Sequence, residues 1–530
     1  MLLLAGTLFT LAFVIYKKIL YPLFFSPLAK IPSAHPLASV SSLWIQWKRL
    51  TNKEFDAVVS GFRQKGPYIR LAPKEVAVNT MECGVKNIYG IGNDNFDKAP
   101  WYNFFQNHGF RNTFCALGSE HALYRRRISG VYSKSFLQSS PHIRAILDAV
   151  IQQRILPILA RTAEKEEPID ILALNLAYGL DFVSAFIFGL PRGVRFLENT
   201  ASREDWLDLY DQTHPSKNMF WLTEHPVLSQ VASLFGIPLI PRNFLKAKRE
   251  LENWAMKRIK LSEDVLSNNP TDETISPGHM PLLYHALKTG IELEQGEKRN
   301  GRFEPNNIQR HELASECLDH LVATRDTFGI TFSYVILNLS RNLEIQEQLR
   351  QELLSISQPF RYHNEKRTEL PTPQTLEALP FLNAVIKESL RLRNTAPTLN
   401  PRITPTGRKV TIGPCDNVPA GTRVGAFAWC LHRNEEGYPN PRTWDPMRWI
   451  VDSSDPKAGA RERWWWAFGS GSRQCLGQNL AFELMRFAVT AIYTNFRTSI
   501  IDDSAFAGDE TFVTGDGSEQ LILKIERVET

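Results

Sequence analysis

The chain has 530 residues, of which 43% are hydrophobic and 11% aromatic, and this is enough to bury a large core. Its 61 basic and 56 acidic residues leave a net charge of only +5, so nucleic acid is not expected as a partner. The six cysteines form no CxxC pair. This argues against a zinc site and a disulfide scaffold, and it favours a reducing compartment.

The first 25 residues predict a membrane anchor. MLLLAGTLFTLAFVIY carries no charge, Lys17 and Lys18 follow it, and the apolar ILYPLFF comes next. A signal peptide has its positive charges before the apolar run, so we expect one transmembrane helix over residues 1–25 with the rest cytosolic. A buried N-terminal helix is the alternative. The proline-rich residues 26–39 predict a hinge, and residues 40–530 predict one globular domain.

Helical periodicity dominates that domain. Residues 312–342 carry apolar side chains at intervals of three or four, which predicts one long helix able to cross the whole domain. Strand-like segments are short, namely YIRLAPKEVAVNT, RKVTIGP, GTRVGAFAW and QLILKIERV. We therefore expect a mainly α fold with small β-sheets.

Two polar pairs lie on predicted helices. In HALYRRR, His121 and Arg125 are one turn apart, although a solvated basic helix face is an alternative there. Within the long helix, ATRDTFG places Asp326 beside Thr327. Such a threonine can donate its hydroxyl proton to the carbonyl four residues back. This structural role is the simpler interpretation when the segment is taken alone.

A cysteine stands in the glycine-rich stretch FGSGSRQCLG, directly before a predicted helix at 478–496. Cys475 is a candidate for a packing residue, a nucleophile or a metal ligand. The positive end of a helix favours a thiolate. No general base is evident locally, and a metal-bound thiolate needs none. A single cysteine can hold haem iron, because the porphyrin supplies the other ligands.

This stretch resembles the haem-binding loop of the cytochrome P450 family, with Phe468, Gly469, Gly471, Arg473, Cys475 and Gly477 all matching. The resemblance implies the P450 fold and haem b (iron protoporphyrin IX) as cofactor. It also implies Cys475 as the axial iron ligand and Arg473 as a partner of a haem propionate.

Other segments resemble the same family. The resemblance implies that His121, Arg125 and Arg402, the last in NPRITP, reach haem propionates. Glu388 and Arg391 in KESLRLR form by themselves an ordinary i, i+3 ion pair. The family implies instead that they join Arg448 of WDPMRW in a buried structural triad that does no chemistry.

ATRDTFG resembles the segment of the family's long helix that carries an acid and an alcohol. The resemblance makes Asp326 and Thr327 the catalytic pair, with the hydroxyl orienting a water and the carboxylate relaying protons. Two positions depart from the family pattern. Thr324 stands where a glycine is usual, and Phe328 replaces a second hydroxyl and is expected in the wall of the substrate pocket.

The resemblance, closest to fungal members that tailor secondary metabolites, predicts a haem-thiolate monooxygenase. It would insert one atom of O2 into a hydrophobic small molecule and act as a monomer at the endoplasmic reticulum membrane, in contact with lipid. Electrons would come from NADPH through a separate flavoprotein reductase. The alternatives are an O2-independent haem-thiolate isomerase or dehydratase and a non-catalytic haem-binding protein.

Two surfaces are expected from the same resemblance. The pocket walls come from WYNFFQNHGFRNTF, WLDLYDQTHPSKNMFWL, the residues after Arg391 and FVTGDGSE, and their composition suits a ring-containing molecule. The reductase would dock on basic residues near the cysteine loop. These are Arg433, Arg442, Arg461 and Arg463.

Overall fold

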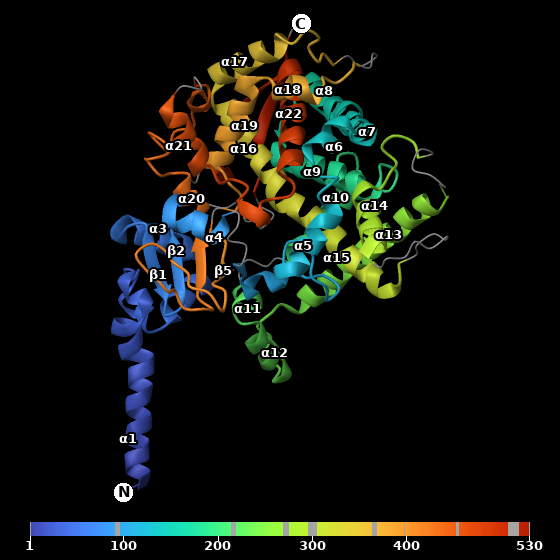
Figure 1. Cartoon of the computed structure of the whole chain (residues 1–530). Coiled ribbons are helices and arrows are strands. Elements are labelled where there is room, and N and C mark those ends of the chain that lie inside the picture. Colours follow the sequence, from blue (N-terminus) through green and yellow to red (C-terminus); the bar gives the residue numbers. More distant parts are fainter. Residues whose placement is uncertain are drawn as a thin grey trace.

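The N-terminal helix stands apart from the body of the molecule (Figure 1). In the computed structural model, residues 2–90, 96–213, 219–268, 275–294, 305–362, 368–396, 398–451, 455–506 and 519–528 are described. Helix α1 (Leu2–Ile15) continues into η1 (Tyr16–Phe25), and the 23-residue span Leu3–Phe25 is apolar, long enough to cross a membrane and unburied. Helix α9 (Ile171–Phe188) passes the same test of length and composition, but it lies almost wholly inside the fold.

The residues after this span are fastened to the first sheet. Two short turns follow η1, namely η2 (Pro27–Lys30) and η3 (Pro36–Ser39). Arg70 is 1% exposed, and its guanidinium donates to the carbonyl oxygens of Pro22 and Pro73, at 2.8 Å in each case. The segment between anchor and body is therefore held at one end by a buried arginine.

Five strands form a sheet beside the anchor, in the order β1-β2-β6-β5-β3. The strands are β1 (Tyr68–Ala72), β2 (Glu75–Val78), β3 (Asp97–Lys98), β5 (Arg402–Ile403) and β6 (Arg423–Ala426). Strands β2 and β6 run parallel, and the other neighbours are antiparallel. The register sets Lys98 opposite Arg402, so two cations from distant parts of the chain share one sheet edge.

A second sheet of three strands, in the order β4-β8-β7, lies near the C-terminus. It contains β4 (Ile169–Asp170), β7 (Phe496–Asp502) and β8 (Ile522–Arg527). Three of the four predicted strand segments contain a named strand. In RKVTIGP the structure has only an isolated bridge, Ile412 with Cys415, so that prediction is wrong.

The predicted long helix crosses the body diagonally in Figure 1, but it is not uniform. It consists of α15 (Asn307–Ala323), the π-helical stretch η8 (Thr324–Gly329) and α16 (Ile330–Arg341). Helix α9 packs very close to η8: a Cβ on Gly179 would lie 2.8 Å from Phe328 Cδ1, and a Cβ on Gly329 would lie 2.9 Å from Leu176 Cα. Only glycine at these two positions permits this approach.

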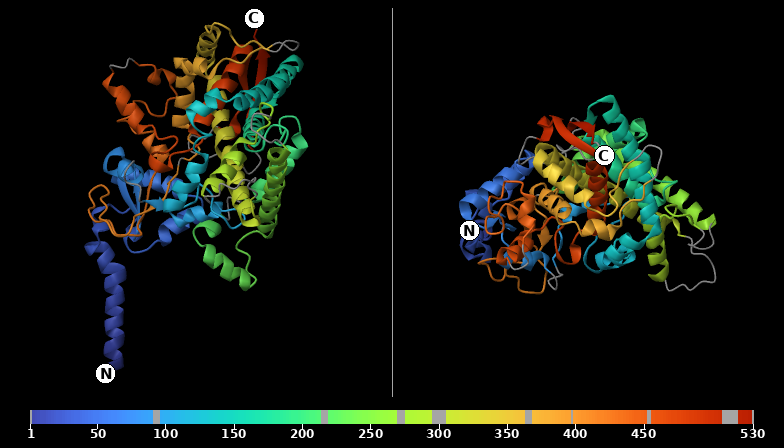
Figure 2. Two further views of the ribbon diagram at one scale, coloured as in Figure 1. Left: turned by 45° about the vertical axis from the view of Figure 1, so that its right-hand side comes forward. Right: turned by 90° about the horizontal axis from the view of Figure 1, so that it is seen from above.

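Helices of the body surround this central element, whereas α12 (Pro226–Leu234) projects away from it (Figure 2). The main core gathers residues of α9, α15, α16, α19 (Pro380–Leu392) and α22 (Gln478–Asn495). The remaining helices are α2 (Leu43–Leu50), α3 (Glu54–Lys65), α4 (Lys86–Tyr89), α5 (Gly118–Ile128), α6 (Lys134–Ser139), α7 (Pro141–Val150), α8 (Leu156–Lys165), α10 (Thr200–Thr213), α11 (Met219–Thr223), α12 (Pro226–Leu234), α13 (Arg242–Asn268), α14 (Leu282–Glu294), α17 (Leu343–Leu354), α18 (Pro373–Glu377), α20 (Ala428–Leu431) and α21 (Pro456–Trp464). Short turns are η4 (Met81–Val85), η5 (Pro100–Phe105), η6 (Ile151–Ile155), η9 (Pro446–Trp449), η10 (Gly471–Arg473) and η11 (Ser504–Phe506).

Candidate active site

The cysteine loop is fixed by glycine geometry. Gly469 and Gly471 have φ values of +70° and +71°, which favour glycine. A Cβ on Gly471 would lie 2.1 Å from the carbonyl oxygen of Tyr89, so no larger residue fits there. The N–H of Cys475 donates to the carbonyl of Phe468 at 2.9 Å, and α22 begins three residues later. The loop therefore presents Cys475 at the N-terminus of a long helix, as predicted.

The electrostatics of this thiol differ from the expectation. Cys475 Sγ is accessible but faces the inside of the fold, and this desolvation raises the pKa of the thiol above its ordinary value. The N–H groups of Gly477 and Gln478 and the charges of Arg125 and Lys98 act in the opposite direction but are weaker. The helix N-terminus therefore favours the thiolate but does not outweigh the effect of burial.

Five basic side chains converge near the cysteine loop, and we call them the cationic cluster: Lys98, His121, Arg125, Arg402 and Arg473. Arg125 Nη1 donates to the carbonyl of Gln474 at 2.8 Å, directly before the cysteine. Arg473 donates to the carbonyl of Ala116 at 2.6 Å and to Asp97 Oδ1 at 3.0 Å. The structure therefore places four predicted residues, His121, Arg125, Arg402 and Arg473, in one site.

The charges in this cluster oppose one another. Burial, with Arg473 and Lys98 nearby, lowers the pKa of His121 to about 3, so its ring is neutral. Burial and Arg402 lower the pKa of Arg473 to about 10, and the same causes hold the pKa of Lys98 well below its ordinary value. Repulsion among buried cations is relieved by an anion. The two propionates of haem supply such charge, so a thiol ligand beside this cluster fits haem.

Lys98 is the member of the cluster that no motif marked. It is 8% exposed, its ammonium donates to the carbonyl of Phe114, and it lies 3.5 Å from the Phe114 ring centroid and 4.3 Å from that of Tyr102. It comes from the two-residue strand β3, which has no periodicity to detect. Only its pairing with Arg402 brings it to the site.

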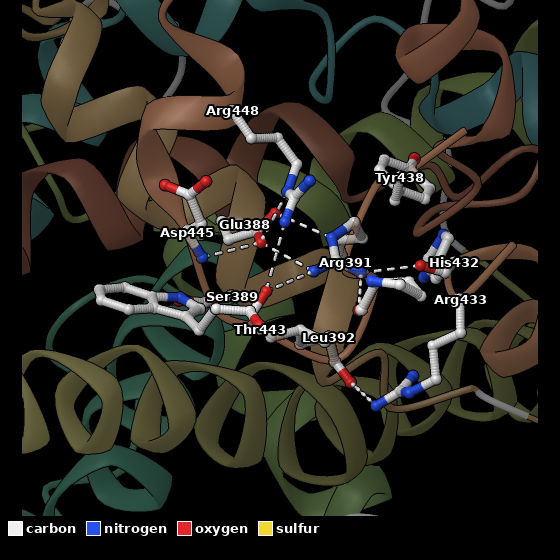
Figure 3. A network of polar contacts seen from close by, with 12 residues as sticks. Glu388, Ser389, Arg391, Leu392, His432, Arg433, Tyr438, Thr443, Asp445 and Arg448 are labelled. Atoms are coloured by element: carbon white, nitrogen blue, oxygen red, sulfur yellow. Dashed lines mark hydrogen bonds and ion pairs between the residues drawn. The ribbon is translucent and has the colours of Figure 1, made fainter. Parts of the chain in front are cut away.

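The expected triad forms a saturated network (Figure 3). Arg391 binds Glu388 through two hydrogen bonds of 2.8 and 2.7 Å, and Arg448 Nε donates to Glu388 Oε1 at 3.1 Å. The Asp445 N–H and the Trp449 indole also donate to this carboxylate, at 3.0 and 2.9 Å. The side chains of Glu388 and Arg391 are fully buried. The network therefore joins α19 to the chain segment that precedes the cysteine loop.

Arg391 also binds backbone. Its Nη1 donates to the carbonyls of His432 and Pro441 at 2.7 Å each, and its Nη2 donates to that of Thr443 at 3.1 Å. A buried guanidinium that uses its donors in this way fixes the path of residues 432–448.

The acid–alcohol pair lies in the π-helical stretch. Thr327 is exposed and donates its hydroxyl proton to the carbonyl of Ala323 at 2.7 Å, as the simpler interpretation expected. Its oxygen lone pairs stay able to accept a hydrogen bond. Asp326 Oδ2 accepts from the Tyr210 hydroxyl at 2.6 Å, and Oδ1 accepts from Arg325 at 3.2 Å. Tyr210, on α10, belongs to a predicted wall segment, but its bond to Asp326 had no signal in the sequence.

Phe328 is not among the residues that line the cavity containing Tyr210. It is 5% exposed and packs against Tyr178 of α9, with ring centroids 5.5 Å apart. The helix turns this side chain toward the core, and the expectation that it walls the substrate pocket is wrong for this cavity. Thr324 uses its hydroxyl to donate to the carbonyl of His320 at 2.9 Å.

A small cavity of about 40 Å³ is lined by Tyr210, the hydrogen-bond partner of Asp326. Its lining residues are Phe104, Phe105, Asn107, Tyr210, Thr213, Phe244, Lys248, Leu251, Leu318, Asp319 and Val322. Two predicted wall segments contribute to it, although residues 214–218 of the second lie outside the described part. Residues 512–518 of the C-terminal segment also lie outside it, and the residues after Arg391 do not line this cavity. Helix α13 was missed as a wall.

The expected docking arginines behave differently from one another. Arg461 is buried, donates to the carbonyl of Arg448 at 3.0 Å and pairs with Asp455, so it presents no charge to a partner. Arg433 is half-buried over the Trp429 ring, at 4.1 Å, and donates to the carbonyl of Leu392. Arg442 and Arg463 are exposed.

Residues 36–517 match the family model described as Cytochrome P450. The chain belongs to the cytochrome P450 family. It is 27% identical to the cytochrome P450 monooxygenase avaI of Aspergillus versicolor, over 80% of this chain and 93% of that protein. It is 25% identical to the monooxygenase orf2 of Aspergillus niger (96% and 95%) and 26% identical to macH of Penicillium terrestre (92% and 91%).

These matches confirm several predictions about this cytochrome P450. The fold is mainly helical with small sheets, and the chain is an enzyme of the cytochrome P450 monooxygenase class. Its fungal relatives support the expected role as a tailoring monooxygenase of secondary metabolism. The family implies haem as cofactor, a small-molecule substrate and a redox partner.

Proposed function

We propose that Cys475 Sγ is the axial ligand of haem b and that the cationic cluster binds its propionates. The observation that carries the proposal is the convergence of one inward-facing thiol and five basic side chains on a loop that only glycine can build. When bound, a thiolate-ligated haem activates O2 for insertion of one oxygen atom into an organic substrate. Glu388, Arg391 and Arg448 hold the proximal segment in place.

Asp326 and Thr327 supply the protons for this reaction. Because the Thr327 proton is committed to Ala323, its oxygen accepts a hydrogen bond from a water and orients it. Asp326 is partly exposed, and Tyr210 and Arg325 fix its two oxygens. The carboxylate therefore holds a defined position from which it relays protons from solvent.

The substrate is a hydrophobic small molecule, and one end of it enters the cavity of about 40 Å³ that Tyr210 lines. Most of the lining is aromatic or aliphatic, contributed by η5, α13 and α15. Electrons come from NADPH through a separate flavoprotein reductase. The exposed Arg442 and Arg463 give this partner a basic surface near the cysteine loop.

The enzyme is a monomer on the endoplasmic reticulum membrane, with residues 1–25 as anchor, 26–39 as hinge and 40–530 as cytosolic catalytic domain. A second apolar surface supports the membrane assignment, since α12 projects from the same end of the body as α1 (Figures 1 and 2). Its exposed apolar side chains, with those just beyond it, are Val227, Leu228, Val231, Leu234, Phe235 and Ile237. Such a patch beside an anchor suits lipid contact.

The ligand assignment is tested by Cys475→Ser. Reduced wild-type protein with CO should show the red-shifted Soret band of a thiolate-ligated haem, and the variant should lose it entirely. Cys83→Ser, at another exposed cysteine, is the control and should keep the band. A band that persists in Cys475→Ser would refute the assignment. Turnover without NADPH, reductase and O2 would favour the isomerase alternative.

A further inference from the structure

One carboxylate in the cavity, that of Asp319, accepts no hydrogen bond from the described residues. Asp319 lies on α15 and lines the cavity with Leu318 and Val322 of the same helix. Across the described ranges, its carboxylate makes no hydrogen bond and no ion pair. Lys248, the other charged lining residue, already donates to the carbonyl of Gln106 at 2.7 Å. The carboxylate is therefore the charged group of the cavity that is still available to a ligand.

The surroundings of Asp319 disfavour its ionised form as long as no hydrogen-bond donor reaches the carboxylate. Burial raises its pKa to about 7, and Glu316 and Asp326 add to this, while His320 and Lys98 act against it. A half-buried carboxylate gains free energy from a donor that a ligand brings into the cavity. Its neighbours on the same helix, Leu318 and Val322, are apolar and supply no donor.

Asp319 is linked to the acid–alcohol pair through the central helix and through Tyr210. It precedes Asp326 by seven residues along the same central helix, and Tyr210, which donates to Asp326, lines the same cavity. Lys98 acts electrostatically on both Asp319 and Cys475. A group that reaches Asp319 would thus share the cavity of about 40 Å³ with the tyrosine that holds Asp326, and the rest of its molecule would extend beyond the cavity.

We infer that Asp319 is the specificity-determining residue of this enzyme and that its substrate is an apolar, ring-containing molecule with an N–H or O–H donor bound to that carboxylate. This inference rests on the proposed function, since it takes the cavity as the substrate site. The donor is a protonated amine or a hydroxyl, and both give the same contact.

Three probes of similar size separate these sources: N,N-dimethyl-4-phenylbutylamine, 4-phenylbutan-1-ol and 1-methoxy-4-phenylbutane. Their Kd values are measured from the Soret shift of the oxidised, full-length holoenzyme at pH 7.5. The wild type should bind the alcohol about 3- to 10-fold more tightly than the ether, because a neutral hydrogen bond contributes this much. A charged amine should bind at least 10-fold more tightly than the ether if the natural donor is an amine.

Two variants test the residue. Asp319→Asn keeps an acceptor, so the alcohol should retain its advantage over the ether while the amine loses most of its own. Asp319→Leu should abolish the tighter binding of both the alcohol and the amine relative to the ether. The Kd of the ether itself should stay within about twofold of the wild-type value, because the ether makes no hydrogen bond to Asp319. Val322→Ala is the matched control one turn away, and it should change the Kd of all three probes alike.

The inference is overturned if the wild type does not distinguish the probes, or if Asp319→Leu leaves their ratios unchanged. If Asp319→Leu lowers the haem content but leaves the Kd ratios of the probes unchanged, Asp319 only balances the charge of Lys98. This result also refutes the inference. Failure of the proposed function looks different, because the thiolate-type CO band would then be missing from the wild type itself.

Discussion

Glu388 and Asp319 are both carboxylates inside the same protein, but their surroundings are opposite. Glu388 accepts hydrogen bonds from Arg391, Arg448, Asp445 and Trp449 and has no capacity left for another ligand. Asp319 faces a cavity and accepts none within the described ranges. A saturated carboxylate fixes the chain around it, whereas an unsaturated one is available to a molecule from outside. Glu388 therefore stabilises the fold, whereas Asp319 is available to bind a ligand.

The largest effect is expected at the saturated carboxylate. Glu388→Gln leaves Arg391 and Arg448 buried without their countercharge, which should destabilise the fold by about 3–5 kcal/mol. Haem content should fall sharply, and the midpoint of denaturant unfolding should drop. Glu347→Gln is the control, since its ion pair with Arg497 is exposed and contributes about 0–1 kcal/mol. Equal stability of Glu388→Gln and Glu347→Gln would show that Glu388 contributes no more to folding than an exposed ion pair does.

The next largest effect concerns proton delivery. Thr327→Ala should keep consuming NADPH but form at least about tenfold less product per NADPH, with hydrogen peroxide in its place, because the water is no longer oriented. Thr324→Ala removes a similar hydroxyl from the same π-helical stretch and should keep its coupling. Product and peroxide are quantified per NADPH oxidised. Full coupling in Thr327→Ala would show that protons take another route.

Binding of the amine probe should depend on pH through the charge of Asp319. Its pKa is raised to about 7, so lowering the pH from 8 to 6 protonates it and removes its charge. The Kd of the amine probe should therefore rise as the pH falls, approaching tenfold per unit below 7, while that of the ether stays flat. The groups that act on Asp319 are Glu316, His320, Lys98 and Asp326.

Asp319→Leu should give a flat pH profile for the amine probe. A wild-type profile that does not change between pH 6 and 8 would contradict a titrating carboxylate at the binding position.

The smallest effect is expected for the tyrosine that holds Asp326. Tyr210→Phe removes the hydrogen bond to Asp326 Oδ2 but keeps the ring in the cavity wall. We expect kcat to fall about 2- to 5-fold, in line with one lost hydrogen bond, with little change in KM. Tyr284→Phe, which loses a similar bond to Glu263, should leave kcat unchanged. A solvent isotope effect equal to that of the wild type would argue against a role for Tyr210 in proton transfer.

The sequence could predict what lies in contiguous motifs. The loop around Cys475, the pair Glu388 and Arg391, and the pair Asp326 and Thr327 each occupy a few neighbouring residues whose spacing carries the chemistry. The helix after the loop was predicted at 478–496 and observed at Gln478–Asn495. Local patterns were sufficient because local geometry determines these features.

Lys98, Tyr210 and Asp319 could not be found in this way. Lys98 comes from a two-residue strand, and Tyr210 and Asp319 lie on helices where they match the ordinary alternation of polar and apolar residues. Their roles depend on which elements tertiary packing brings together. The same limit explains Phe328, which was assigned to a pocket although the close approach of α9 turns it into the core.

The π-helical stretch η8 also accommodates an extra residue in the central helix. An α-helix turns by about 100° per residue, whereas a π-helical stretch turns by less because each of its turns holds more residues. Deleting one residue of Thr324–Gly329 and letting an ordinary α-helix form would therefore leave Leu318, Asp319 and Val322 close to their present direction. An added residue without such a stretch would instead rotate the cavity face of α15 away from its alignment with a core-facing α16.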